Sequence, residues 1–482
     1  MKEVRTRFPP SPTGKLHIGS LRTALYNWLF ARKYGGKFLL RIEDTDRTRL
    51  VEGATQNIID NLEWAELDYD NEPMIQSQRL EFYHRAADEL LSKKLAYRCF
   101  CPAARLEQLR QQQQARKLPT RYDGHCRDQA PGDVEDKLAG GIPSVIRFAL
   151  PQHGAVVFND LIRGEVRFNL STLDDQILIK SDGFPTYHLA SVVDDHDMGI
   201  THVIRGEEWL SSTPKHILLY QAFNWEVPTF AHLPLLLNPD RSKLSKRTGD
   251  VAVDDYRAAG YLPDAVLNFV LLLGWNPGTE QEFFSREEMT SQFDLSQVNK
   301  SGAIFNHEKL DWINGNYIRS LTAERLAKLA LPWLQQARLV DGKTNIEYAR
   351  TVISLEQKRI KRFGELPELV DYFFRQPSLN PTLIPWRGQP AAETARVLRQ
   401  LNDVLKTIPD EKFTPTDLEK LIKEWIGKQA LANGSVLWPM RVALTGKNAS
   451  PGPFEVSCVL GKKITTERIE QAAQSLTNTT TS

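Results

Sequence analysis

The chain has 482 residues, 41% hydrophobic and 25% charged, which is the balance of a globular protein with room for several domains. A formal net charge of +1 argues against a protein that coats nucleic acid through overall basicity, although a local basic groove still allows RNA binding. Four cysteines argue against a secreted disulfide scaffold, and no apolar run approaches the ~20 residues of a membrane span. The first predicted strand leaves no room for a signal peptide, so we expect a cytoplasmic protein without membrane contact.

The first 43 residues predict a strand, a loop, a helix and a second strand. Apolar residues alternate with charged ones over residues 4–8, and prolines then interrupt regular structure up to Gly14. Ser20 is a suitable cap for a helix with an apolar stripe, and Gly35 ends that helix. The next strand covers residues 37–43. This opening predicts a parallel sheet with helices on its faces.

Residues 96–185 have a different character. A Gln-rich, basic stretch over 107–117 predicts a solvated helix. Strand-like pieces follow at 144–149, 156–159 and 165–168. We interpret this region as an α+β insertion into the parallel sheet, which resumes with strands at 186–193 and 201–205. Helical periodicity dominates from about residue 254, and the C-terminal third is predicted to be all-helical.

The segment 11–20 joins the first predicted strand to the first predicted helix. Backbone N–H groups and the helix dipole at such a junction favour a bound phosphate. Gly19 lets a nucleotide approach the backbone closely, and His17 adds a donor that can neutralise phosphate charge. His17 alone would suit an ordinary loop histidine, but the whole string is far more specific.

A second motif covers residues 243–247 and lies close to Arg241. Lys243, Lys246 and Arg247 place three cations within five residues. They would form a phosphate clamp if the loop folds over the first motif, because phosphoryl chemistry rests on positioning and charge stabilisation. The alternative is a solvated basic loop. Its place after a phosphate-binding turn and an apolar run over 233–237 favours the clamp.

These two strings, HIGS at 17–20 and KLSKR at 243–247, resemble the signature motifs of class I aminoacyl-tRNA synthetases, usually written HIGH and KMSKS. Four further strings, RFPPSPTGKLHIGS, LLRIEDTD, DGFPTYHLASVVDD and VIRGEEWLSSTPKH, are similar to bacterial-type glutamyl-tRNA synthetases. Ser20 replaces the last histidine of the first motif, a departure common in the glutamyl branch. The similarity is strong over the N-terminal two thirds, and the helical remainder fits by architecture.

The resemblance implies a multidomain fold: an α/β Rossmann-like catalytic domain with an α+β insertion, followed by all-α anticodon-binding domains. The expected boundaries are 1–95 and 186–240 for the two catalytic halves, 96–185 for an acceptor-stem-binding insertion, 241–320 for the KLSKR loop and stem-contact domain, and 321–376 and 377–482 for two helical anticodon-binding domains.

The implied reaction has two steps. Glutamate attacks the α-phosphate of ATP to give glutamyl-adenylate, with Mg²⁺ on the phosphates, and the 2′-hydroxyl of the terminal tRNA adenosine then accepts the glutamyl group. No protein nucleophile is needed, so catalysis rests on orientation and charge stabilisation. The expected transition-state stabilisers are His17, Lys243 and Lys246. The expected ATP-binding residues are these three with Gly19, Trp209, Leu236 and Ser245.

The side-chain carboxylate of glutamate needs a guanidinium, which can pair with it bidentately. Residues at the family's glutamate-binding positions are Arg7, Ser11, Glu43, Tyr187, Ser191 and Arg205. Arg7 and Arg205 match the arginines for the side chain, and Glu43 matches the acid for the α-amino group. Ser191 departs from the family, because relatives often carry asparagine there, and a water could bridge the shorter side chain to the substrate.

Three cysteines lie close together in the sequence and suggest a zinc site. Cys99 and Cys101 form a C-x-C pair, and Cys126 follows 25 residues later. The fourth ligand is open: His125 is chemically suitable but adjacent to Cys126, whereas Tyr122 matches a Cys-x-Cys, Tyr-x₃-Cys set of some synthetase relatives. The alternative is three free thiols left by a decayed site.

The segment 358–365 resembles the part of the family that reads the third anticodon base. Enzymes restricted to glutamate tRNA tend to have arginine where Gly364 stands, and a guanidinium can distinguish bases. Glycine there predicts that tRNA(Gln) is accepted as well as tRNA(Glu). The alternative is that Gly364 ends a helix before Pro367 and that Arg362 or Arg359 reads the base.

Three other interpretations compete with a monomeric glutamyl-tRNA synthetase. Glutaminyl relatives usually have methionine where Leu244 stands and a β-barrel anticodon part. A short tRNA-modifying paralogue lacks anticodon domains, which the chain length argues against. A non-catalytic RNA-binding relative would not need His17, Lys243 and Lys246.

Overall fold

The computed structural model describes residues 2–244 and 251–478 and divides into two compact units. The first unit comprises Met1–Arg257 and Pro263–Leu310, and the second comprises Ala258–Leu262 and Asp311–Ser482. Ser245 and Lys246, which the sequence assigns to ATP binding, lie outside the described residues. Within the described ranges, no helix is both long and apolar enough to cross a membrane.

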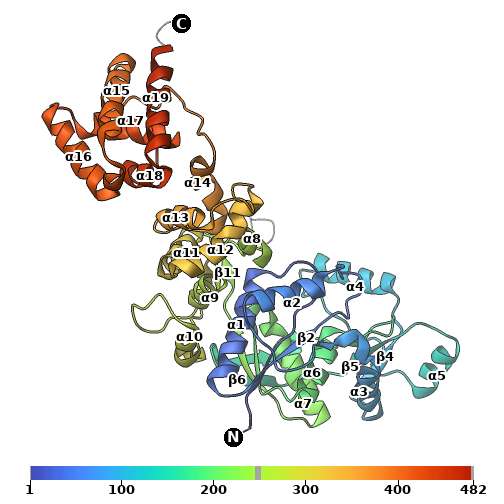
Figure 1. The fold of residues 1–482 in the computed structure, drawn as a ribbon. Helices are drawn as coiled ribbons and strands as arrows, with labels where there is room; N and C mark the ends of the chain where they lie inside the picture. The colour runs from blue at the N-terminus through green and yellow to red at the C-terminus, as the bar shows by residue number, and fades with distance from the viewer. Residues whose placement is uncertain (1, 245–250, 479–482) are drawn as a thin grey trace. The chain divides into compact units, whose positions relative to one another are not determined.

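The first unit is built mainly on parallel strands, as predicted (Figure 1). Its main strands are β1 (Arg5–Phe8), β2 (Lys37–Ile42), β3 (Met74–Ile75), β6 (Ala155–Asp160), β7 (Gly164–Asn169), β9 (His202–Gly206) and β10 (Thr229–Leu233). They form two hydrogen-bonded sets, in the orders β1-β2-β3 and β7-β6-β10-β9. Thr201 joins the sets, because its amide donates to the Arg5 carbonyl (3.0 Å) and its hydroxyl accepts from the Arg5 amide (2.9 Å).

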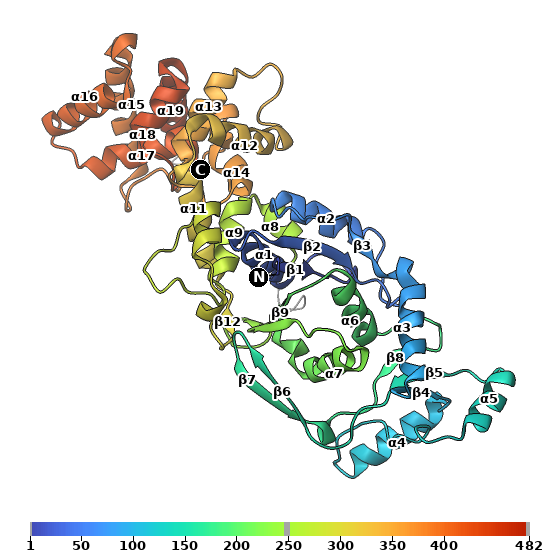
Figure 2. The ribbon, with the colours of Figure 1, turned by 90° about the horizontal axis from the view of Figure 1, so that it is seen from below.

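Helices cover both faces of this sheet (Figure 2). They are α1 (Ile18–Lys33), α2 (Ala54–Trp64), α3 (Leu80–Ser92), α6 (Tyr187–Asp197) and α7 (Thr213–Phe223). Leu39 of β2 shares a buried cluster with Ile217 of α7. Thr6, paired with Phe38 in register, instead donates to the Asn27 carbonyl of α1 (2.9 Å). Because neighbouring side chains alternate between faces, α1 lies opposite α7, which explains the apolar run of β2.

Helix α1 begins earlier than the sequence predicts. His17 is its N-cap, with extended backbone, and its Nδ1 accepts from the Gly19 amide (2.9 Å). Ser20 lies inside the first turn, so its prediction as the cap was wrong. The earlier start is stabilised from a distance, since the Ile18 amide donates to the Val251 carbonyl (2.8 Å). An imidazole nitrogen thus takes the place that a serine or aspartate oxygen usually has.

The predicted strand at 186–193 was wrong, because these residues begin helix α6. Leu189, Val192 and Val193 are buried at i, i+3 and i+4, which is the spacing of one helical face. The same short apolar run fits a buried strand, and periodicity alone does not separate the two. The error matters for the site, because α6 carries Tyr187, Ser191 and Asp195.

The segment 96–185 contains two separate structures. A small antiparallel sheet in the order β4-β5-β8 carries two helices. These elements are β4 (Ala96–Cys99), β5 (Val145–Phe148), β8 (Ile177–Ile179), α4 (Ala103–Ala115) and α5 (Pro131–Ala139). No residue of α4 is buried, which confirms the predicted solvated helix. The hairpin β6–β7 instead joins the main sheet, where Asp160 is in register with Phe230 of β10.

The remaining elements of the chain after β10 are mostly helical. They are β11 (Leu236–Leu237), α8 (Val253–Ala259), α9 (Pro263–Leu272), α10 (Arg286–Gln292), β12 (Ala303–Ile304), α11 (His307–Ser320), α12 (Ala323–Gln336), α13 (Ile346–Glu356), α14 (Leu366–Phe374), α15 (Ala391–Thr407), α16 (Pro415–Lys428), α17 (Asn433–Thr445), α18 (Pro453–Leu460) and α19 (Lys462–Asn478). The described part of the second unit contains no strand, so the all-helical prediction for the C-terminal third is confirmed. One buried cluster runs through it, from Ile318 of α11 to Leu476 of α19.

Candidate functional site

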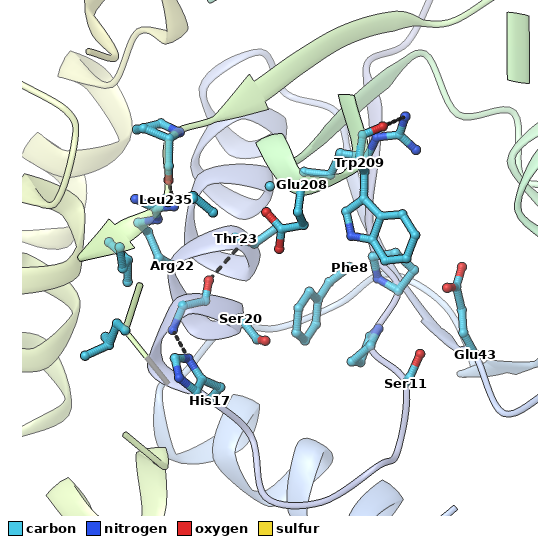
Figure 3. Close-up of a pocket in the computed structure, with 18 of the residues that line it drawn as sticks. Phe8, Ser11, His17, Ser20, Arg22, Thr23, Glu43, Glu208, Trp209 and Leu235 are labelled. Carbon is cyan, nitrogen blue, oxygen red and sulfur yellow. Dashed lines mark hydrogen bonds between the residues drawn. The ribbon is translucent and has the colours of Figure 1, made fainter. Parts of the chain in front are cut away.

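A cavity of about 460 Å³ opens where β1, β2 and β9 end (Figure 3). This is the carboxyl edge of the parallel strands, where α/β proteins bind ligands. Ten residues that the sequence assigns to substrate binding line it: Arg7, Ser11, His17, Gly19, Glu43, Tyr187, Arg205, Trp209, Leu236 and Lys243. His17 and Ser20 lie at one end, and Ser11 and Glu43 lie at the other (Figure 3).

The end around His17 is built from backbone and small side chains. The hydrogen bond from the Gly19 amide holds the imidazole at the start of α1. A Cβ added to Gly19 would lie 3.2 Å from His17 Nδ1 and 3.6 Å from Leu236 Cδ1. Glycine therefore keeps this passage between α1 and β11 open, and the helix N-terminus supplies N–H groups and a positive dipole to an anion there.

The first two residues of the second motif, Lys243 and Leu244, lie at the same end of the cavity. Leu244 donates its amide to the Leu236 carbonyl (2.9 Å), and Lys243 pairs with Leu237 in an isolated antiparallel bridge. Lys243 lines the cavity with an exposed side chain. The structure therefore brings Lys243 and His17 to one cavity, although 226 positions separate them in the chain. The predicted contributions of Ser245 and Lys246 fall on residues that the structure does not describe.

Arg205 lies at the opposite end of the cavity, and the residue is 5% exposed. Nε donates to His232 Nε2 (3.1 Å), and Nη1 donates to the Tyr187 hydroxyl (2.9 Å) and toward His216 Nδ1 (3.4 Å). Nη2 donates to the Thr213 hydroxyl (2.8 Å) and the Trp209 carbonyl (3.2 Å). A guanidinium has five N–H donors, so every one of them has a partner within the protein.

Arg7 differs from Arg205 in having an open donor. Its Nε donates to Asp195 Oδ1 (3.1 Å), and the side chain is 1% exposed. Its Nη1 is buried without a hydrogen-bond partner within the described residues. A buried unpartnered donor is costly, and Arg7 lines the cavity, so an anionic ligand group there would satisfy it.

Glu43 is anchored by a buried arginine. Arg41, which is completely buried, donates to Glu43 Oε1 (2.9 Å) and to Asp195 Oδ1 (2.6 Å). Burial raises the pKa of Glu43, and the charge and hydrogen bond of Arg41 oppose that rise. The Glu43 amide also donates to the Pro10 carbonyl (3.0 Å), which ties the end of β2 to the loop after β1. The carboxylate is therefore held at the cavity by its neighbours.

Ser191 does not line the cavity, unlike the other five predicted glutamate-binding residues. Its side chain is 1% exposed, and its hydroxyl accepts a hydrogen bond from Arg41 Nη2 (3.3 Å). A serine at this position is therefore a partner of the buried charge cluster.

Sequence reasoning missed several lining residues. Glu208 is an exposed carboxylate at the cavity that has no hydrogen bond or ion pair within the described residues. Arg22 is buried and donates to the carbonyls of Pro234 (2.5 Å) and Leu273 (3.0 Å), which fixes the strand end beside Leu235. Glu208 belongs to the string VIRGEEWLSSTPKH, so the resemblance could have pointed to it as a site residue. The partners of Arg22 lie more than 200 residues away and give no local signal.

The comparisons with known proteins agree with this geometry. The family described as tRNA synthetases class I (E and Q), catalytic domain, matches residues 3–312, and an anticodon binding domain matches residues 325–473. The chain belongs to the class I glutamyl- and glutaminyl-tRNA synthetase family. This synthetase is 45% identical to a glutamate–tRNA ligase of Dehalococcoides mccartyi, over 98% of its own length and 97% of the relative's. It is also 45% identical to one of Chloroherpeton thalassium, over 98% of each chain.

The solved structures agree with the sequence relatives. A crystal structure of a glutamate tRNA ligase from Elizabethkingia meningosepticum, in complex with its amino acid, superposes with a TM-score of 0.89. That protein is 36% identical to this synthetase, and the match covers 98% of this chain and 100% of the other. The predicted fold class, with its Rossmann-like catalytic part and helical anticodon-binding part, is therefore confirmed.

Three cysteines come together in space at the end of β4. The sulfurs of Cys99, Cys101 and Cys126 lie within 4.8 Å of one another. The Tyr122 hydroxyl lies 3.4 Å from Cys99 Sγ and 3.7 Å from Cys101 Sγ. His125 is exposed and outside this group, so the geometry favours Tyr122 as the fourth member. Three thiolates and an oxygen are a donor set that suits Zn²⁺.

Gly364 has a structural role in the second unit. It lies within a short 3-10 helix, Phe363–Glu365, and does not end a helix, although Pro367 does stand in the first turn of α14 as expected. A Cβ on Gly364 would lie 2.6 Å from the Ala259 carbonyl oxygen, so the glycine permits this close approach.

Two acidic side chains bind the arginines next to Gly364 in the sequence. Glu365 accepts from Arg362 Nε (2.8 Å), and both carboxylate oxygens of Glu356 accept from Arg359 Nη1 (3.0 Å each).

Proposed function

We propose that this synthetase joins L-glutamate to tRNA with consumption of ATP, through a glutamyl-adenylate intermediate. The observation that carries the proposal is a single cavity with a helix N-terminus and a cationic motif at one end and buried arginines at the other. Such a cavity can hold a triphosphate beside an amino acid with an acidic side chain. Its membership of the synthetase family and the names of its relatives support the same activity.

The first step needs orientation and charge, and no protein nucleophile. An α-carboxylate oxygen attacks the α-phosphorus of ATP, the bond to the bridging oxygen breaks, and pyrophosphate leaves. Negative charge grows on the phosphate oxygens, where His17, Lys243 and Lys246 would stabilise it. Gly19, Trp209, Leu236 and Ser245 would hold the nucleotide.

The implied Mg²⁺ would neutralise phosphate charge. Among the described residues two acids line the cavity. Glu43 is paired with Arg41, which leaves Glu208 as the carboxylate suited to a hard cation.

The other end would bind the amino acid. Arg7 offers its unpartnered Nη1 to the side-chain carboxylate, Arg205 offers its charge, and Tyr187 offers its hydroxyl. Glu43 would hold the α-amino group, and Ser11 would contact the substrate from the loop after β1. Ser191 would act indirectly, because it contacts Arg41 and does not line the cavity. In the second step the 2′-hydroxyl of the terminal adenosine attacks the adenylate carbonyl, and AMP leaves.

Labelled-glutamate charging of purified tRNA(Glu) tests this function, with pyrophosphate exchange measured in parallel with and without tRNA. We expect glutamate to be transferred and glutamine to be rejected. Charging with glutamine would favour a glutaminyl enzyme, and the absence of both exchange and charging would favour a non-catalytic tRNA-binding relative.

The proposal also assigns the parts of the chain to the tRNA. Residues 96–185 would bind the acceptor stem, 241–320 would contact the stem, and 321–376 and 377–482 would bind the anticodon arm. The family match to an anticodon binding domain supports the last assignment. We further propose a monomer in the cytoplasm, and four free cysteines are consistent with a reducing compartment. Light scattering of the purified protein with and without tRNA checks the monomer.

Glycine at position 364 supports a relaxed anticodon preference, in which tRNA(Gln) also receives glutamate. Charging of both purified tRNAs with labelled glutamate tests it, and refusal of tRNA(Gln) by the parent protein would refute it. Gly364→Arg should then reduce tRNA(Gln) charging selectively. Gly364→Ala is the matched control, because both variants place a Cβ against Ala259 and only one adds a guanidinium. Arg362→Ala and Arg359→Ala test the alternative readers.

The cysteine cluster supports one structural zinc ion, held by Cys99, Cys101 and Cys126 with the Tyr122 hydroxyl. The ion would fasten the end of β4 to the turn that carries Cys126. Elemental analysis of protein never exposed to chelator should find about one zinc per chain. Cys101→Ser should lower that content, whereas Cys458→Ser, far along the sequence, is the control and should not. A metal-free parent protein would favour the free-thiol alternative.

A further inference from the structure

Two buried polar residues lie behind the amino-acid end of the cavity and do not line it. Asp160 ends β6 and is 1% exposed, and His232 on β10 is 0% exposed. Asp160 Oδ2 lies 2.6 Å from His232 Nδ1, and His232 Nε2 lies 3.1 Å from Arg205 Nε. A continuous hydrogen-bonded chain therefore connects a buried carboxylate to the arginine of the cavity.

The partners of His232 determine which of its nitrogens carries the proton. Arginine nitrogens only donate, so His232 Nε2 must accept from Arg205. The ring proton is then on Nδ1, where it is donated to Asp160. Burial lowers the pKa of His232, with an opposing contribution from Asp160, so the ring is neutral near pH 7. Carboxylate partners commonly fix a histidine tautomer in this manner.

Asp160 is itself held in its charged form. Burial acts to raise its pKa, but the hydrogen bonds from His232 and from the Arg163 and Ile162 amides outweigh burial and lower it. These two amides lie 2.9 and 3.0 Å from Oδ1 and come from the turn between β6 and β7. The acceptor at the far end of the chain is therefore fixed in place and in charge.

The chain continues beyond Arg205 to Tyr187. Because Arg205 Nη1 donates to the Tyr187 oxygen, the tyrosine accepts at this contact and keeps its own proton for another partner. Burial raises the pKa of Tyr187, which keeps the hydroxyl protonated. Tyr187 lines the cavity, and a donated proton in the cavity suits an acceptor-only group such as a carboxylate.

We propose that Asp160 and His232 are positioning residues for the amino-acid site. They hold Arg205 in the orientation in which it donates to Tyr187, and the Tyr187 proton is thereby directed to the side-chain carboxylate of the bound amino acid. This inference rests on the proposed binding roles of Arg205 and Tyr187. Its consequence is that residues without substrate contact set the affinity for glutamate.

Two substitutions of His232 separate positioning from simple packing. His232→Asn keeps a donor near Nδ1 for Asp160 but does not reach Arg205. His232→Gln keeps an acceptor near Nε2 for Arg205 but loses Asp160. We expect His232→Asn to raise KM for glutamate about 10-fold, the effect of one lost hydrogen bond to a charged group, and His232→Gln to restore much of that loss. KM for ATP should stay within about 2-fold of the parent in both.

Asp160→Asn tests the far end of the chain. An amide can donate to His232 Nδ1, which moves the ring proton to Nε2, where it opposes Arg205 Nε. We expect a rise in KM for glutamate of about 10-fold, with kcat reduced less. Asp175→Asn is the matched control. Asp175 is also buried and hydrogen-bonded, to Tyr97 and the Leu150 amide, and does not line the cavity.

A double substitution and a reference variant complete the experiment. In a Tyr187→Phe background Asp160→Asn should raise KM for glutamate little further, because the Tyr187 hydroxyl proton that it redirects is gone.

Arg205→Ala distinguishes failure of the positioning inference from failure of the proposed binding role of Arg205. If Arg205→Ala raises KM for glutamate and the Asp160 and His232 variants match the parent, the positioning inference is overturned alone. If Arg205→Ala itself leaves KM unchanged, the binding role of Arg205 fails. Equal losses for His232→Asn and His232→Gln, with KM for ATP rising in step, would indicate a packing role and overturn the inference.

Discussion

The two ends of the cavity are built on different principles. The end around His17, to which we assign ATP, uses local elements: a loop, a helix N-terminus and the exposed Lys243. The amino-acid end uses buried charges whose partners come from distant strands and helices, with Arg7, Arg41 and Arg205 all at most 5% exposed. On the proposed assignment, a few local elements would bind the nucleotide, which every synthetase uses, whereas the network of buried charges would be specific for one amino-acid side chain.

The largest effect on kcat/KM is expected from a substitution at the proposed amino-acid end of the cavity. Arg205→Ala removes the charge opposite the substrate carboxylate and leaves five acceptor contacts empty, so kcat/KM for glutamate should fall about 10³-fold. Steady-state charging of tRNA(Glu) measures this. Arg32→Ala is the control, because Arg32 pairs with Asp68 and Asp70 away from the cavity. An equal loss for an uncharged glutamate analogue would contradict a role in side-chain recognition.

Substitutions at the proposed ATP end should lower kcat and leave KM for glutamate nearly unchanged. Lys246→Ala should reduce kcat about 10²-fold, the usual loss for one charge-assisted contact in a transition state. Lys243→Ala should act in the same direction, since Lys243 lines the cavity. Lys15→Ala, an exposed lysine near the first motif that does not line the cavity, is the control. Near-normal pyrophosphate exchange in both variants would show that Lys243 and Lys246 have no catalytic role.

The buried histidine His188 should make the stability of the protein depend on pH. Burial, with Lys215 and Arg205, lowers the pKa of His188 to about 4, below its ordinary value. Between the ordinary pKa and this value only the unfolded chain takes up the proton, so the free energy of unfolding should decrease as the pH falls through that window. His188→Gln should make the decrease smaller. Urea unfolding at about pH 7.5, 6 and 5 checks it, and an unchanged slope would contradict the prediction.

The smallest effect should come from Ser191. Ser191→Asn introduces the residue that relatives often carry, and its amide adds a donor where the serine hydroxyl is occupied by Arg41. We expect KM for glutamate to fall about 3- to 5-fold, roughly one neutral hydrogen bond, with kcat unchanged. Ser191→Ala is the control that removes the Arg41 contact alone. A raised KM for Ser191→Asn would show that the site is adapted to the smaller side chain.

The sequence predicted the local parts of this protein well. The strand–loop–helix start and the solvated helix over 107–117 depend on neighbouring residues, and the sequence predicted both. The strand predicted at 186–193 was wrong because a seven- or eight-residue apolar run fits a buried helix equally well. The cap of α1 was misplaced because Val251, far along the chain, stabilises the earlier start.

The network behind Arg205 could not be predicted from the sequence. Asp160 lies 72 positions from His232, and Arg41 lies 154 positions from Asp195. Each of these residues alone would suit a surface ion pair or a strand end. Only the parallel pairing of β6 with β10 shows that Asp160 lies beside His232, behind the cavity.

The place of β6 has a consequence for exchanging parts between relatives. By sequence, residues 96–185 look like a module that could be replaced whole, yet Asp160 within them is hydrogen-bonded to His232 in the sheet. A chimaera with crossover points at 95 and 185 would therefore take Asp160 from one parent and His232 from the other. Crossovers that leave β6 and β7 with the host sheet would keep Asp160 and His232 from one parent. On the positioning role proposed above, the two kinds of chimaera should differ in their affinity for glutamate.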